Sequence, residues 1–154
     1  MIKENAFSCF DRSDLSEADL LSRINSVSAS IANSFLDYCN HEQFDCVFVH
    51  NIFSHGRHIA AASSFVHAAE KLNIPVIATH HDFYWEREEY QQLSFPAIET
   101  YLRKYVPPAA DNIRHICINS LAAEELAKRT GIRCVVMGDL FDFSQEQWII
   151  DAFN

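Results

Sequence analysis

The sequence contains only three glycines in 154 residues: Gly56, Gly131 and Gly138. Their spacing excludes a G-x-G-x-x-G turn and a P-loop, so a nucleotide phosphate would have no Gly-rich loop of this chain to bind. The five cysteines are Cys9, Cys39, Cys46, Cys117 and Cys134. Their number is odd and no two form a C-x-x-C pair, which argues against a disulfide framework and against a zinc ribbon.

Long apolar runs and excess basic charge are lacking too. No run approaches the ~20 apolar residues of a membrane span, and the N-terminus has no apolar signal core. The net charge is −9, whereas a nucleic-acid binder needs a basic face that displaces counterions. We therefore expect a cytoplasmic protein with no transmembrane segment and no nucleic-acid partner.

What the sequence does contain is a regular alternation of apolar strands with amphipathic helices. Apolar runs predict strands at 45–50, 75–79, 114–119 and 133–137. Helical spacing predicts a long helix that follows a cap at Asp14 and runs to Tyr38, helices at 57–72, 96–105 and 121–130, and a short one from Ser144. The pattern predicts an α/β fold, a single Rossmann-like domain over residues 1–154. We expect three layers and a mainly parallel sheet of about four or five strands.

Several helix ends carry recognisable signals. Asp14-Leu-Ser-Glu17 resembles a capping box before the first helix. Ser120 is the expected N-cap of the helix at 121–130, and Gly131 stands where a C-terminal glycine belongs.

Polar residues follow three of the predicted strands. His81 and Asp82 come after the strand at 75–79, and Asn119 and Ser120 after the strand at 114–119. The strand at 45–50 is followed by Asn51, Ser54, His55 and Gly56, whose glycine would let backbone approach a ligand closely. Ligands of open α/β sheets bind outside the carboxyl ends of the strands, so these residues predict a binding rim.

The loop after His81-Asp82 carries Tyr84, Trp85, Arg87 and Glu88. Aromatic rings and planar charged groups suit carbohydrate recognition, but Phe83 and Trp85 could equally cover the edge of the sheet. His80 should point to the opposite side of its strand from His81, which favours a structural role.

Two other chemistries remain as lesser alternatives. A metal site from His50, His55, His58, His80, His81 and Asp82 is conceivable, although no compact ligand spacing appears. A serine nucleophile at Ser120 lacks the G-x-S-x-G elbow. We expect no metal and no cofactor.

The order of these motifs resembles a known family. The pieces are Cys46–Asn51 with Ser54-His55-Gly56, Val76–Asp82 with Phe83–Arg87, Ile118-Asn-Ser120, and Val135-Val136 with Phe141-Asp-Phe143. Together, over 45–143, they are similar to the N-terminal, acceptor-side domain of a retaining glycosyltransferase of GT-B architecture, family 4 or group 1. The resemblance is partial. The family's opening strand with its Gly-rich loop and its C-terminal donor domain are not found. Met137-Gly138-Asp139 stands where the family typically has Val-Pro-Asn.

The resemblance implies transfer of a sugar from a nucleotide-sugar donor to a hydroxyl acceptor. His81 would assist at the junction of sugar and phosphate, and Asp82 would orient it or the loop. The loops 51–56 and 84–88 would line the acceptor side. Apart from the resemblance, the helix N-terminus at Asn119 and Ser120 could bind an anion, although Ser120 could equally be no more than the helix cap. Donor binding would need a second domain or a partner chain, or self-association. The alternative is a non-catalytic, flavodoxin-like binding or interaction module.

Overall fold

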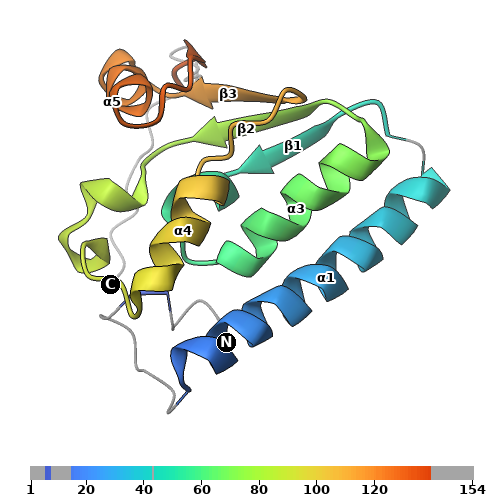
Figure 1. Cartoon of the computed structure of the whole chain (residues 1–154). Helices are drawn as coiled ribbons and strands as arrows, with labels where there is room; N and C mark the ends of the chain where they lie inside the picture. Colours follow the sequence, from blue (N-terminus) through green and yellow to red (C-terminus); the bar gives the residue numbers. More distant parts are fainter. Residues whose placement is uncertain (1–5, 8–14, 43, 140–154) are drawn as a thin grey trace, which may run out of the picture.

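The computed structural model describes residues 6–7, 15–42 and 44–139, and its fold is α/β and Rossmann-like, as predicted (Figure 1). The sheet has four strands in the order β1-β2-β3-β4, and every neighbouring pair is parallel. The strands are β1 Val47–His50, β2 Val76–His80, β3 Ile113–Cys117 and β4 Cys134–Val136. Parallel neighbours need a crossover between them, and the helices of the sequence pattern supply it.

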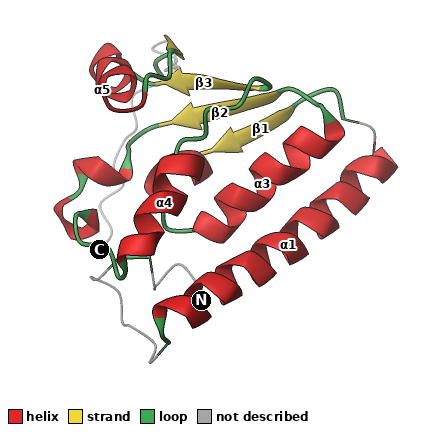
Figure 2. Cartoon of the chain, in the orientation of Figure 1, coloured by secondary structure: helices red, strands yellow, loops and turns green. Residues whose placement is uncertain are grey.

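Each crossover contains one of the predicted helices (Figure 2). The helices are α3 Ile59–Leu72 between β1 and β2, α4 Pro96–Tyr105 between β2 and β3, and α5 Ser120–Thr130 between β3 and β4. The long helix α1, Glu17–Glu42, lies along α3, and buried Ser28 and Ser63 join them by an Oγ–Oγ hydrogen bond of 2.7 Å. None of the described helices is both long and apolar enough to cross a membrane.

The hydrophobic core lies between the sheet and these helices. Val49, Val76, Ala78 and Ile113 turn one face of the sheet toward the helices, and all four are buried. Phe7 lies in the same core, 4.7 Å from the ring of Tyr90. Side chains alternate along each strand, so the neighbouring positions face the other way.

The second face of the sheet is largely open among the described residues. Its Phe48 is 71% exposed and Val135 is 60% exposed. The cores around α3, α4 and α5 all include strand residues of the first face. The described residues therefore contain the sheet and the helices on one side of it, and the third predicted layer is not among them.

Several element boundaries differ from the sequence predictions. The first helix begins after Ser16, whose Oγ accepts a hydrogen bond from the Asp19 N–H at 3.2 Å. His80 belongs to β2, not to the loop after it. The short helices α2 Ile52–His55, η2 Tyr84–Glu86 and η3 Glu88–Tyr90 were not predicted. The expected cap at Asp14, Cys9, the motif at 141–143 and the helix from Ser144 lie outside the described residues.

Candidate functional site

The carboxyl ends of β1 and β2 lie side by side and carry the polar residues of the expected rim. Asn51 adopts a left-handed backbone conformation with φ 58°, which Asn tolerates better than most residues. Its Oδ1 accepts a hydrogen bond from the His81 N–H at 2.9 Å, so Asn51 positions the backbone of His81. The fold thus brings Asn51 and His81 together through a direct hydrogen bond.

The ring of His81 is half-buried and has its own neighbours. The His50 ring meets it edge-on at a centroid distance of 4.6 Å, and His50 Nδ1 is 2.7 Å from Thr79 Oγ1. On the other side His81 Nε2 lies 3.5 Å from Asp139 Oδ1. The sequence analysis had not assigned a role to Asp139, because it sits in the segment that departs from the family pattern.

Asp82 connects the loop after β1 (51–56) with the loop after β2 (82–87). One carboxylate oxygen contacts His55 Nε2, and the other accepts from Arg87 Nε at 2.7 Å and from a second guanidinium nitrogen. Burial alone would raise the pKa of Asp82, but the hydrogen bonds from Arg87 and His55 outweigh it, and the pKa lies below its usual value. Asp82 therefore stays ionised and holds the loops at 51–56 and 82–87 together.

Two residues of the predicted rim are buried. Ser54 is fully buried and its Oγ donates to the Asn51 carbonyl at 3.1 Å. Gly56 has φ +66°, and a Cβ there would meet Leu102 Cδ2 at 2.9 Å and Phe7 Cζ at 3.0 Å. The missing side chain of Gly56 therefore lets the backbone lie close to side chains of the protein core.

His81 lines a cleft of about 530 Å³ against the start of α5. Glu86 lies on its side of the cleft, and the helix side carries Asn119, Ala122 and Lys128 together with the carboxylates of Glu124 and Glu125. Asn119 Oδ1 accepts from the Ala122 N–H at 2.8 Å, so Asn119 is the N-cap and Ser120 is the first helical residue, which corrects the prediction that Ser120 is the cap. The N–H groups of a first helical turn and the helix dipole favour an anion at such a place.

Tyr84 and Trp85 lie away from this cleft. They line two adjoining cavities of about 460 and 440 Å³ that share no lining residue with it. The Trp85 ring stacks on Phe83 at 4.5 Å, and the Arg129 guanidinium lies 5.4 Å from it. Arg87 is bound to Asp82, and Glu88 is exposed. The structure therefore separates the aromatic part of the loop from His81.

Beneath the site, His80 and His115 form a buried pair that the sequence analysis did not predict, because His115 sits in an apolar strand pattern. His115 Nε2 donates to the Pro108 carbonyl at 3.0 Å, which leaves its Nδ1 to accept from His80 Nε2 at 2.8 Å. His80 Nδ1 is then a buried acceptor with no partner among the described residues. Burial and the neighbouring His115 lower the pKa of His80 to about 3, so this pair is neutral.

The candidate site offers donors and charges but no evident metal cage. Among the residues that the structure describes, no three His, Cys, Asp or Glu side chains gather closely enough to hold a metal ion. What the arrangement provides is an imidazole facing the start of a helix across a cleft.

The carboxyl ends of the strands of a parallel α/β sheet, where this cleft lies, are the place at which α/β domains bind ligands. The profile of Glycosyltransferase Family 4 matches residues 18–137, a span that contains all four strands. The chain belongs to this glycosyltransferase family.

Two curated proteins are similar to the chain. The mannosylglucosylglycerate synthase of Petrotoga mobilis is 41% identical over 110 residues, which cover 71% of this chain and 25% of the relative. The mannosylglucosylglycerate synthase of Thermotoga maritima is 34% identical over 105 residues, which cover 67% of this chain and 23% of the relative. The chain thus spans about a quarter of the length of either relative. No solved structure shows a significant match to the chain.

Proposed function

We propose that the chain is the acceptor-side domain of a retaining glycosyltransferase of GT-B architecture, which transfers a hexose from a nucleotide-sugar to a hydroxyl acceptor. The observation that carries the proposal is the position of His81, which faces the cleft at the start of α5. Family membership supplies the reaction class. Because the chain spans a quarter of its relatives, donor binding is assigned to polypeptide beyond this domain.

In this proposal His81 acts where the sugar is joined to phosphate. An imidazole N–H donates a hydrogen bond to an anion, so it can stabilise charge that develops on the leaving phosphate oxygen. The α5 N-terminus across the cleft adds N–H donors for the same charge. Asn51 fixes the His81 backbone, whereas Asp82 acts on the loops through His55 and Arg87.

The names of the relatives suggest the sugar and the acceptor. A mannosylglucosylglycerate synthase attaches mannose, by its name, to give a glycoside of glucosylglycerate. We therefore propose mannose as the transferred hexose and a glucosylglycerate as the acceptor for this chain. A cytosolic location belongs to the same proposal and is supported by the free thiols of Cys39, Cys46, Cys117 and Cys134.

A chimera tests this function directly. The chain would replace the matching 110 residues of the Petrotoga mobilis synthase, so that the relative supplies the remaining polypeptide. With nucleotide-linked mannose and glucosylglycerate, we expect the chimera to form the mannosylated product. His81→Ala should lower kcat by roughly 10²-fold or more, because a charge-stabilising donor is lost.

The control for this experiment is His41→Ala, which changes an exposed histidine on α1. It should leave kcat unchanged. A folded chimera without turnover would contradict the proposed function. Full turnover in His81→Ala would contradict only the role of His81.

A further inference from the structure

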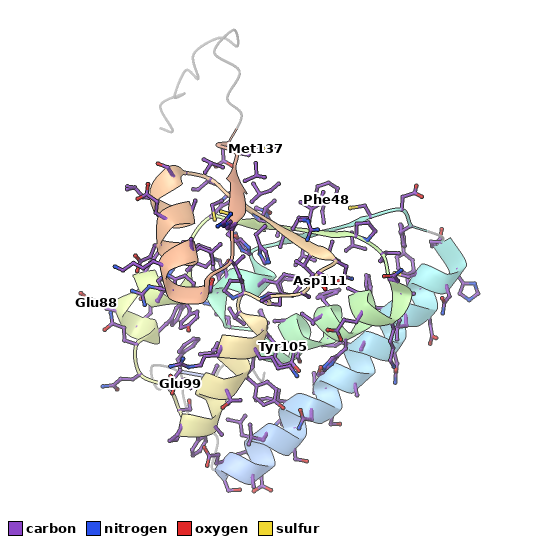
Figure 3. The ribbon with its side chains drawn as sticks, turned by 45° about the horizontal axis from the view of Figure 1, so that its top comes forward. Phe48, Glu88, Glu99, Tyr105, Asp111 and Met137 are labelled. Carbon is purple, nitrogen blue, oxygen red and sulfur yellow. The ribbon has the colours of Figure 1, made fainter. Side chains whose placement is uncertain are left out.

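Two arginines beside the candidate site converge on a single carboxylate oxygen. Arg57 follows the loop after β1, whereas Arg87 and Glu89 belong to the loop after β2. Arg57 Nη2 and Arg87 Nη1 each lie 3.9 Å from the same atom, Glu89 Oε1. The two arginine side chains are 41% and 42% exposed, and Figure 3 labels Glu88, the residue before Glu89, at the edge of the molecule. We call Arg57 and Arg87 the arginine pair.

Each guanidinium of the arginine pair is held on its other side by the protein. Arg57 Nε donates a hydrogen bond to the hydroxyl of Tyr90, whose ring is buried. Arg87 Nε donates to Asp82 Oδ2 at 2.7 Å, and Arg87 Nη2 donates to the same oxygen. The two guanidinium carbons lie 5.2 and 6.0 Å from the centre of the Tyr90 ring. The arginine pair is therefore positioned before any ligand arrives, which lowers the entropic cost of binding one.

Glu89 is a weak partner for these two cations. Charge-assisted N–H···O hydrogen bonds are roughly 2.7–2.9 Å long, so a separation of 3.9 Å is an ion pair without such a bond. The Glu89 side chain is 53% exposed, and exposed ion pairs contribute little to stability. The carboxylate of a ligand can therefore displace that of Glu89 at little cost. Its two oxygens can accept hydrogen bonds from the two arginines at once.

We propose that the arginine pair binds the carboxylate of the acceptor and so selects an anionic acceptor over a neutral one. This inference rests on the proposed function, in which the acceptor is a glucosylglycerate, whose glycerate end carries a carboxylate. The chain has a net charge of −9 and repels anions as a whole, so an anionic acceptor needs local cations. Asp82, which follows His81 in the chain, binds Arg87 directly, and this places the arginine pair beside the loop that carries His81.

Two glycosides that differ only at the carboxylate test this selection on the full chain. Glucosylglycerate carries the carboxylate, and glucosylglycerol has a neutral hydroxymethyl group in its place. In isothermal titration calorimetry, glucosylglycerate should bind at least roughly tenfold more tightly than glucosylglycerol. Raising the salt concentration should weaken this preference, because the arginine pair is partly exposed.

Two substitutions should act in opposite directions. Arg57→Gln should remove most of the preference for glucosylglycerate, because one of the two cations is lost. Glu89→Gln should instead tighten the binding of glucosylglycerate by roughly two- to fivefold, because the competing carboxylate is gone. The matched controls are Arg103→Gln and Glu99→Gln, in an exposed ion pair on α4 whose glutamate Figure 3 labels, and both should leave the preference as it is. Circular dichroism of each variant checks that the fold is kept.

Several results would overturn the carboxylate site. They are no binding, equal binding of the two glycosides, an Arg57→Gln variant that keeps the preference, or a Glu89→Gln variant that binds glucosylglycerate no more tightly. Displacement of glucosylglycerate by nucleotide-linked mannose would also overturn it, because the arginine pair would then bind the phosphates of the donor.

The chimera with the Petrotoga mobilis synthase separates this inference from the proposed function. A chimera that transfers mannose equally well to both glycosides would reject the carboxylate site and keep the proposed function. A folded chimera without turnover, together with an intact binding preference of the chain, would reject the proposed function and keep the carboxylate site.

Discussion

At the scale of single residues, the site depends on which partner each histidine has. His81 is oriented by Asn51 and faces the cleft, His55 is bound to Asp82, and His80 is buried against His115. Three histidines that look alike in the sequence therefore have three different environments. Their neighbours decide this, because an imidazole can be a donor, an acceptor or a cation.

The buried pair makes stability depend on pH. The pKa of His80 is about 3 in the folded chain and near 6.5 when unfolded, so the unfolded state binds the proton first as the pH falls. Stability from this group is present above pH 6.5 and is lost as the pH falls toward 3. We expect the free energy of unfolding to drop on the order of 2 kcal/mol between pH 7 and pH 5, measured by urea denaturation.

A non-titrating substitution separates this effect from general acid sensitivity. His80→Gln keeps an N–H that can reach His115 and should remove the part of the pH dependence between pH 7 and pH 5 that His80 supplies, while buried His115, whose pKa is also lowered by burial, keeps its own part. His41→Gln, on the exposed side of α1, should keep it. An unchanged pH slope in His80→Gln would show that His80 titrates normally in the folded chain.

At the scale of elements, the first turn of α5 contributes both to the stability of the helix and to the lining of the cleft. Asn119 caps the helix through its Oδ1, and the same turn lines the cleft opposite His81. The Asn119 cap satisfies the Ala122 N–H and leaves the other N–H groups of the first turn of α5 available to other partners. An anion would bind to these remaining N–H groups.

The cap can be assigned by mutation. Asn119→Ala should lower the free energy of unfolding by about 1 kcal/mol, because the Ala122 N–H loses its acceptor. Asn119→Asp keeps a side-chain acceptor and should restore most of that stability. Ser120→Ala, one residue into the helix, is the control and should have little effect by chemical denaturation. If Ser120→Ala cost as much as Asn119→Ala, the cap would be wrongly assigned.

At the scale of the whole molecule, the described sheet has four strands and one open face, and the chain spans a quarter of its relatives. Both observations fit a domain that works as part of a larger assembly. The sites for donor and acceptor need not lie on one domain, because a cleft between domains is a common place for ligands.

This leads to a prediction about activity. The isolated chain should form no mannosylated product from nucleotide-linked mannose and glucosylglycerate, whereas the chimera with the Petrotoga mobilis synthase should. Product can be measured by mass spectrometry under identical conditions. Turnover by the isolated chain would show that both substrates bind to these 154 residues, and would contradict the need for a second domain.

The sequence by itself determined the class of fold and the family. Hydrophobic periodicity and helix-end signals such as Gly131 act locally, so the strands, the main helices and their order could be predicted before any contact was known. The order of motifs around His81-Asp82 pointed to the family for the same reason, since motifs are local in the chain.

Tertiary structure decided the rest. Only the folded chain shows that Asp82 binds His55 and Arg87, that Gly56 packs on Leu102, and that Tyr84 and Trp85 lie outside the His81 cleft. Whether a strand face is covered is likewise a property of the assembled sheet. Asp82 and Arg87 are only five positions apart, but the Asp82–His55 and Gly56–Leu102 contacts join residues 27 or more positions apart, and the place of Tyr84 and Trp85 depends on which side a loop leaves the sheet. No local pattern encodes such contacts.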